Sequence, residues 1–322
     1  MCSSDLDAAR YWAAGTSIGD DFPYREGDLE AGERLLQKLW NASRLVDQLT
    51  ADVDRDVAEE DVSGADLADI DRWFLARLDA TVESITERFL SYEFAKARDE
   101  LRTFFWSTFC DDYLEIAKQR LSDGGDESTE YALVRAHRTF LKLWAPFLPH
   151  ITEELYHRLY DPDESLHTSD WPSPAGYDAD LAAGETTMDA ISALRRYKTE
   201  EGLALNATLD HVEIYGHVGG FADAFADVMH VDTIETVEGE PDITTEISDV
   251  DLDYSLVGPE FGNRVGDIDA GIEAGDFEVR DGTLVVAGEF ELDDEMFEIE
   301  KSRTYSGEGE MLEAGDAIVI VR

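Results

Sequence analysis

The sequence predicts a mainly α-helical protein, in which a bundle of long helices is followed by a small α+β domain. In the first half of the chain, apolar residues recur every three or four positions, which is the period of one face of an α-helix. Beyond residues 171–174, which read Trp-Pro-Ser-Pro, short runs rich in β-branched residues replace that pattern. Long helices joined by short polar breaks are typical of an up-and-down bundle, and strands mixed with short helices are typical of an α+β domain.

The helices of the bundle follow from this apolar spacing and from the residues that interrupt it. The clearest pattern places apolar side chains about one helical turn apart, at Leu67, Ile70, Phe74, Leu78, Val82, Ile85 and Phe89. A later pattern ends at the Ser-Asp-Gly-Gly-Asp run of residues 122–126, and Pro146 and Pro149 interrupt the next. We therefore predict helices over 29–49, 67–89, 92–121, 129–144 and 151–159.

The sequence of the second half of the chain predicts shorter helices and strands. A helix is expected over 185–200, and helical stretches at 219–229 and 259–273 separate the predicted strands. Strands are predicted over 211–215, 231–237, 283–286, 297–301 and 317–321. Because residues 172–184 are rich in Pro, Gly and Ala, we place a domain boundary there. The predicted division is residues 1–28 as a leading segment, 29–175 as the bundle and 185–322 as the α+β domain.

The chain is strongly acidic, with 74 acidic residues against 26 basic ones and a formal net charge of −48. The acids occur in every segment instead of forming one tail. Such a charge would destabilise an ordinary cytosolic domain by self-repulsion, but molar salt shortens the Debye length to about 3 Å and removes most of that penalty. The composition therefore predicts a halophilic protein, and the overall acidity is no argument against a nucleic-acid partner.

Cysteine usage and hydropathy exclude several classes of protein. Cys2 and Cys110 are the only cysteines and neither belongs to a CxxC motif, which excludes a disulfide framework and a cysteine zinc site. The sequence has no apolar run of about 18 residues and no signal-peptide pattern at its N-terminus. We therefore expect a cytoplasmic protein that does not associate with membranes.

The sequence predicts neither a catalytic residue nor a metal site. It has no P-loop and no strand-linked GxGxxG motif. His150, Glu154 and His157 share one helical face at a spacing that could bind a metal, but a helix start after Pro149 explains His150 equally well. Acid pairs such as Glu153 with Glu154 could in principle serve a hydrolase, although a solvated face is the simpler interpretation.

Local clusters of basic and aromatic residues are the candidate RNA-binding groups. RNA loops need cations for their phosphates and planar side chains for their unstacked bases. Two basic residues flank Trp40 and Asn41 on the first predicted helix, and three gather on the third, which also carries an aromatic run at 104–106. The candidates are therefore Lys38, Trp40, Asn41, Arg44, Lys96, Arg98, Arg102 and Trp106. The alternative is that these arginines pair with neighbouring acids and that most of the aromatic residues are core.

Several spaced motifs resemble one family of tRNA ligases. Residues 7–46 begin with Asp-Ala-Ala-Arg-Tyr-Trp-Ala, continue through a Gly-Asp-Asp turn at 19–21 and contain Lys-Leu-Trp-Asn-Ala-Ser-Arg at 38–44. Further matches follow in order at 73–78, 104–106, 111–115 and 147–155. This series is similar to the part of valyl-tRNA synthetases that follows the catalytic domain, in their archaeal type. The resemblance implies that the bundle at 29–175 is an anticodon-binding domain.

The resemblance also implies an activity and a set of partners. Valyl-tRNA synthetases are ATP-dependent ligases that activate valine and transfer it to its tRNA, with ATP and Mg²⁺ in the full enzyme. Their HIGH and KMSKS signatures and their editing domain would all precede residue 7, so residues 1–28 resemble the remnant that links the catalytic domain to the bundle. We expect this chain to bind tRNA, to hold no cofactor, to be inactive on its own, and to be a monomer that works with a catalytic domain missing here, as an incomplete gene product.

Two alternatives stay open at this point. The first is an acidic helical module for protein interaction that has no tRNA role. The second is the same fragment of an isoleucyl-type synthetase, although the run at 38–44 and the turn at 19–21 favour the valyl type.

Overall fold

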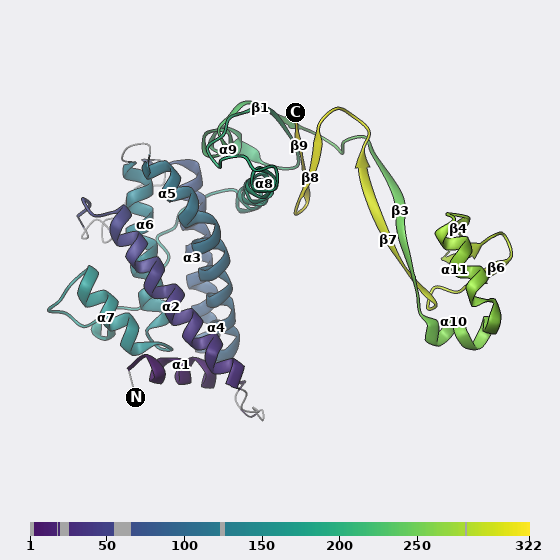
Figure 1. Ribbon diagram of the computed structural model, residues 1–322. Helices are drawn as coiled ribbons and strands as arrows, with labels where there is room; N and C mark the ends of the chain where they lie inside the picture. Colours follow the sequence, from purple (N-terminus) through teal and green to yellow (C-terminus); the bar gives the residue numbers. More distant parts are fainter. Residues whose placement is uncertain (1–2, 18, 20–25, 55–65, 123–125, 281) are drawn as a thin grey trace. The chain divides into compact units, whose positions relative to one another are not determined.

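The computed structural model describes residues 3–17, 19, 26–54, 66–122, 126–280 and 282–322. The chain forms two compact units (Figure 1). The first comprises Met1–Glu238 with Leu312–Val319, and the second comprises Gly239–Met311 with Ile320–Arg322. Cys2 and the two aspartates of the predicted turn at 19–21 lie outside the described residues.

The first unit begins with a helical bundle, which confirms the predicted fold class. Its α-helices are α1 (Ser3–Ala13), α2 (Glu26–Leu49), α3 (Asp69–Leu90), α4 (Phe94–Thr103), α5 (Leu114–Ser122), α6 (Glu127–Trp144) and α7 (Pro149–Leu159). Figure 1 shows α2, α3 and α6 running alongside one another, with α1 lying across one end. The 3₁₀ turn η4 (Leu166–Thr168) follows α7.

The segment predicted as one helix over 92–121 contains a long π-helix, η3 (Phe104–Tyr113), between α4 and α5. The prediction of a continuous α-helix was wrong here, because apolar residues four or five positions apart fit either helix. The wider turn of a π-helix still directs one row of side chains inward, since Phe105, Phe109 and Tyr113 have no exposed surface. The ring of Tyr113 stacks on Phe74 of α3 with their centroids 3.8 Å apart. Aromatic packing therefore dominates the bundle core.

The rest of the first unit is an α/β layer that packs on the bundle. It contains α8 (Leu181–Glu200), β1 (Leu209–Tyr215), the 3₁₀ turn η5 (Gly219–Phe221), α9 (Ala222–Met229), β2 (Val231–Val237) and the larger parts of β8 (Glu310–Ala314) and β9 (Ala317–Val321). The sheet order is β2-β1-β9-β8, and β1 pairs with β2 in parallel. The Trp73 indole N–H donates to the carbonyl of Leu181 at 3.2 Å, which joins α3 to α8. The first unit extends to Glu238, past the boundary predicted within 172–184.

A buried lysine ties α8 to the strands that follow it. The ammonium group of Lys198 donates to the carbonyl oxygens of Leu205, Ala207 and Met229 at 3.1, 2.7 and 2.7 Å. Lys198 has no exposed surface, and the three carbonyls satisfy all of its donors. Lys198 is therefore a structural residue.

The second unit contains a long antiparallel pair and a small α+β cluster. The pair is β3 (Ile243–Leu252) with β7 (Phe297–Tyr305). The cluster contains α10 (Tyr254–Phe261), the 3₁₀ turn η6 (Gly262–Arg264), α11 (Val265–Glu273), β4 (Phe277–Arg280), β5 (Thr283–Val286) and β6 (Phe290–Leu292). Its core includes Val257, Ile268, Leu284, Val286 and Leu292. The strands β3, β4, β6 and β8 were not predicted. β4, β6 and β8 are too short to show a clear alternation, and in β3 a bulge between Ile247 and Asp249 shifts the alternation.

A helix that crosses a lipid bilayer needs about 20 mostly apolar residues in succession. Within the described ranges, none of the helices is both long enough and apolar enough to cross a membrane.

Candidate nucleic-acid interface

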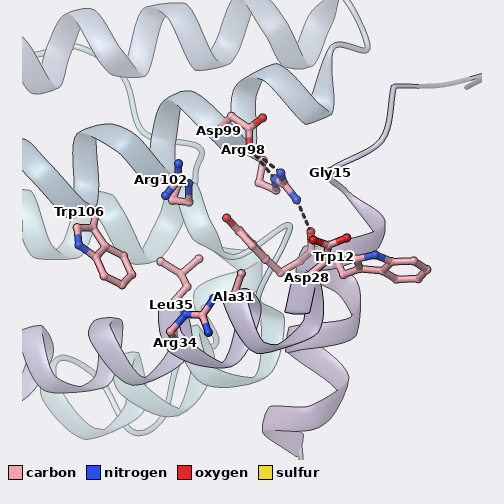
Figure 2. Close-up of a pocket in the computed structure, with 11 residues that line it drawn as sticks. Trp12, Gly15, Asp28, Ala31, Arg34, Leu35, Arg98, Asp99, Arg102 and Trp106 are labelled. Carbon is pink, nitrogen blue, oxygen red and sulfur yellow. Dashed lines mark hydrogen bonds and ion pairs between the residues drawn. The ribbon is translucent and has the colours of Figure 1, made fainter. Parts of the chain in front are cut away.

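The largest basic and aromatic recess near the predicted residues is a cleft between α1, α2, α4 and η3 (Figure 2). Its volume is about 670 Å³. The residues that line it are Tyr11, Trp12, Gly15, Asp28, Ala31, Arg34, Leu35, Arg98, Asp99, Arg102 and Trp106. The cleft thus brings together three arginines, two tryptophans and two aspartates, in a protein whose overall charge is strongly acidic.

Arg98 is fixed in place at the wall of this cleft. Its guanidinium donates to the carbonyl of Tyr11 at 2.9 Å and to Asp99 at 2.6 Å, and it lies 4.5 Å from the centre of the Tyr11 ring. Gly15 permits this approach, because a Cβ there would lie 2.1 Å from the guanidinium. Burial raises the pKa of the Tyr11 hydroxyl, and the Arg98 charge acts in the opposite direction. Arg98 therefore joins the end of α1 to α4.

Arg102 lies one helical turn beyond Arg98 and is exposed. Within the described ranges, no hydrogen bond or ion pair engages its guanidinium. Arg34, across the cleft on α2, forms only a loose pair with Glu30 at 3.5 Å, and both of these side chains are well exposed. Solvent screens such a pair strongly, so Arg34 remains available to an anion.

Lys38 connects α2 to the π-helix. Its ammonium group donates to the carboxylate of Asp111 at 2.7 Å and lies 5.0 Å from the centre of the Trp106 ring. Trp106 is half-buried at the edge of the cleft. The structure thus brings four predicted residues together, namely Lys38, Arg98, Arg102 and Trp106, with Arg98 and Lys38 already engaged by internal partners.

The other predicted residues lie away from this cleft. Trp40 is half-buried beneath the guanidinium of Arg158 from α7, which lies 5.2 Å from the centre of its ring. Asn41 and Arg44 are exposed on α2, and among the described residues Arg44 has no ion pair. Lys96 is exposed and pairs with Glu93 at 2.5 Å. Trp40 and Arg44, four residues apart, share one face of α2 and form a second group.

Sequence reasoning missed two aromatic residues beside basic groups. Trp12 lines the cleft described above. Trp171 lies in a smaller recess of about 210 Å³ with Arg135, Arg138 and Lys142, and its indole N–H donates to the hydroxyl of Thr86 at 2.8 Å. The run Trp-Pro-Ser-Pro indicates only the end of the bundle, so the local pattern carries no signal for Trp171.

A possible metal-binding group lies elsewhere in the first unit. Among the described residues, His211, Glu213 and Glu235 place one ligand atom each within 4.8 Å of one another. This group differs from the possible metal-binding set that the helical spacing of His150, Glu154 and His157 indicated in the sequence. In the structure, the backbone N–H of His150 is bound by Asp7, while His157 pairs with Glu153 at 3.3 Å.

Comparison with known proteins defines the class of protein. Residues 71–214 match the family described as the anticodon-binding domain of tRNA ligase. This range runs from the start of α3 through the bundle and α8 into β1. The chain therefore carries the anticodon-binding domain of a tRNA ligase.

Relatives across the whole chain identify the particular family. The chain is 69% identical over 317 residues to the valine tRNA ligase of Haloarcula marismortui, which covers 98% of the chain and 34% of that protein. It is 33% identical over 338 residues to the enzyme of Thermococcus kodakarensis and 34% identical over 338 residues to that of Methanosarcina mazei. Each match covers 98% of the chain and 37% or 38% of the relative. The chain belongs to the valine tRNA ligase family and spans about a third of these relatives, which confirms the predicted resemblance.

Proposed function

We propose that this chain provides tRNA binding within a valine tRNA ligase, that its cognate partner is the valine tRNA, and that the cleft of α1, α2, α4 and η3 contacts the tRNA. The anticodon-binding domain supports the choice of partner. The single observation that supports the place is Arg102, an exposed guanidinium without an internal ion pair among the described residues, next to Trp106. In a chain of net charge −48, a local excess of arginine is a specific feature.

The residues of the cleft divide into those that set its shape and those that would contact RNA. Arg98 is held by a carbonyl and a carboxylate, so its position is set before tRNA arrives. Arg102 and Arg34 are the exposed cations that would bind phosphate oxygens, which positions the RNA without reading its sequence. Trp106 offers a partly exposed indole on which an unstacked base could lie. Lys38 holds the π-helix against α2 through Asp111, and so fixes the orientation of Trp106.

We infer that activation of valine takes place outside this chain. The sequence has neither nucleotide-binding signature of the family, and the chain spans about a third of its relatives. ATP and Mg²⁺ would bind to other parts of such a ligase, and the chain would contribute orientation of the tRNA, which lowers the entropic cost of the transfer step. Pyrophosphate exchange with valine and ATP by the purified 322-residue chain would contradict this inference.

We also propose that the protein works as a monomer in a salt-rich cytoplasm. The acidic surface supports this environment, since molar salt screens the repulsion between 74 acidic side chains. We expect the chain to unfold when it is dialysed from molar KCl into low salt. Circular dichroism measures this loss of structure.

The binding experiment uses valine tRNA and the purified chain over a range of KCl concentrations in which the chain stays folded. Replacement of Arg102 by alanine should weaken binding about tenfold, equivalent to about 1.4 kcal/mol, and reduce the salt dependence by about one counterion. Arg44→Ala tests the second group in the same way. Arg280→Ala is the control, because Arg280 is an exposed arginine of the second unit that pairs with Glu278.

The competing hypothesis is an acidic protein-interaction module without a tRNA role. It requires that the folded chain bind no tRNA at any KCl concentration, and that Arg102→Ala and Arg280→Ala behave alike. A preference for valine tRNA over an unrelated tRNA would in turn support the valine specificity.

A further inference from the structure

Three metal-ligating side chains meet on one face of the β1–β2 pair. Glu213 of β1 lies in register with Glu235 of β2, and His211 precedes Glu213 by two residues. Because side chains alternate between the two faces of a strand, His211 and Glu213 point to the same side of the sheet. One ligand atom from each of the three lies within 4.8 Å of the others. The register of two parallel strands thus assembles a histidine and two carboxylates from separate parts of the chain.

Glu213 is an unusual residue for its position. Its side chain is only 6% exposed, whereas glutamate is almost never so buried without a compensating partner. One carboxylate oxygen, Oε2, accepts a hydrogen bond from the hydroxyl of Tyr215 at 3.2 Å. The other oxygen, Oε1, lies 3.5 Å from Nε2 of His211. The Tyr215 hydroxyl therefore orients the carboxylate, in the manner of groups that support a metal ligand.

The ring nitrogen Nε2 of His211 supplies a second, independent observation. It is shielded from solvent and has no hydrogen-bond partner among the described residues. A buried polar atom without a partner is unfavourable, and a bound ion or water molecule is one way in which proteins satisfy such an atom. Neutral imidazole nitrogen is also the commonest ligand for transition metals in proteins.

We propose that His211, Glu213 and Glu235 bind a divalent transition-metal ion, with Zn²⁺ the best match. Bonds of about 2.0–2.2 Å in a tetrahedral site place neighbouring ligand atoms roughly 3.3–3.6 Å apart. The separation of 3.5 Å between His211 Nε2 and Glu213 Oε1 agrees with that spacing. Ca²⁺ and Mg²⁺ fit less well, because they prefer sites made of oxygen alone.

The position of the site in the sheet gives a metal ion access from solvent and suits it to link the two strands. Glu235 is exposed and β2 is the edge strand, so an ion can enter from solvent and a water molecule can complete its coordination. An ion held by both strands cross-links β1 to β2. Because such an ion would bind only the folded sheet, it would raise the stability of the first unit according to its concentration relative to Kd.

A second histidine and glutamate group in the bundle provides a matched control. His157 lies 3.3 Å from Oε1 of Glu153, and His167 lies 3.7 Å from Oε2 of the same carboxylate. The two histidines are thus nearest to different oxygens, and His167 also contacts the carbonyl of Pro149 at 3.0 Å. This group has the same residue types but does not converge on one point.

The test titrates ZnCl₂ into the chelator-treated chain in molar KCl, by calorimetry, with the melting temperature as a second readout. One equivalent of Zn²⁺ should bind and raise the melting temperature. Glu235→Gln and His211→Gln should each weaken binding at least roughly 100-fold and abolish the thermal shift, while His157→Gln should change neither. Because Glu235 is exposed, its variant should fold even if substitution of the buried Glu213 prevents folding.

Co²⁺ provides a spectroscopic check on the same variants. The expected result is visible absorption typical of four-coordinate Co²⁺ in the original chain and in His157→Gln, and its loss in Glu235→Gln and His211→Gln. The proposal is overturned if the chain binds no Zn²⁺, or if Zn²⁺ binds equally well to the Glu235→Gln and His211→Gln variants. Neither outcome bears on tRNA binding, because the metal site and the cleft share no residue.

Discussion

The carboxylate of Asp7 accepts hydrogen bonds from the backbone N–H groups of His150 and Ile151, at 3.0 and 2.8 Å. Asp7 has no exposed surface, and the groups it binds are the unpaired donors at the start of α7. A residue at the beginning of the chain therefore caps a helix 143 or 144 positions later. Through this contact α1 is an integral part of the bundle.

Replacement of Asp7 by alanine should destabilise the first unit by about 1–3 kcal/mol, because two buried N–H groups would lose a charged acceptor. Urea unfolding in molar KCl measures this change. Asp7→Asn is the control, since its amide oxygen can still accept both bonds and should recover part of the loss. Equal stability of Asp7→Ala and the original chain would mean that the cap contributes nothing.

Replacement of Gly184 by alanine should disrupt the packing of α8 on α3. A methyl group there would lie 2.1 Å from Cδ1 of Trp73, whose indole is buried and cannot move aside without losing its bond to Leu181. We expect a loss of about 1–3 kcal/mol, measured by thermal unfolding and tryptophan fluorescence. Gly27→Ala in α2 is the matched control, because among the described residues outside its own helical turn no atom would lie within 4 Å of the new methyl group. The higher helix propensity of alanine should leave the stability of this control equal or slightly raised.

Asp71 connects α3 to three other segments, and its removal should be costly. It accepts from Tyr113 at 2.6 Å, from Ser128 at 2.6 Å and from Arg120 at 3.0 Å. Because Asp71→Ala removes the acceptor shared by Tyr113 and Ser128 and leaves the mostly buried Arg120 with Asp126 alone, we expect about 3–5 kcal/mol of destabilisation in chemical unfolding.

A double-mutant cycle separates the pair from its surroundings. The combined Asp71→Ala and Arg120→Ala variant should lose less unfolding free energy than the two single variants lose together, because neither member of the pair is then left without the other. Asp69→Ala on the same helix is the control, since Asp69 is 45% exposed and its pair with Arg72 should contribute less than about 1 kcal/mol. Additive losses at Asp71 and Arg120 would show that the two residues act independently.

Cys110 should resist alkylation in the folded protein. Burial raises the pKa of its thiol from 9.0 to about 12, so the reactive thiolate is only about 10⁻⁴ of the total at pH 8. In a Cys2→Ser background, labelling by iodoacetamide should be slow at pH 8, should increase as pH rises toward 12 and should become rapid in urea. Rapid labelling of the folded chain at pH 8 would contradict the buried position of this residue.

Local pattern predicted much of the fold, and long-range contacts explain what it missed. The apolar spacing through Phe74 and Leu78 gave α3 to within two residues, because that spacing is the helix itself. The cap by Asp7 on α7 was invisible, since the two lie at opposite ends of the bundle sequence. Strand β3 was missed because a bulge between Ile247 and Asp249 shifts the alternation of its apolar residues partway along the strand.

The candidate sites were predicted to different extents. Lys38, Arg98, Arg102 and Trp106 do lie together, yet their ion pairs depend on neighbours such as Asp111 that no local pattern identifies. The group formed by His211, Glu213 and Glu235 depends on strand register, which spacing along the chain does not reveal.

The three carbonyls around the ammonium of Lys198 bear on how the contacts of this protein should respond to salt. Dissolved ions weaken attractions that they can surround, such as the exposed pair of Lys96 with Glu93, but they cannot enter the space around a fully enclosed charge. The contact of Lys198 with Met229 is therefore expected to keep its strength over the whole range of KCl concentrations in which the chain is folded. The buried Lys198 thus provides a charged contact that does not depend on the salt concentration, in a chain whose surface charges do.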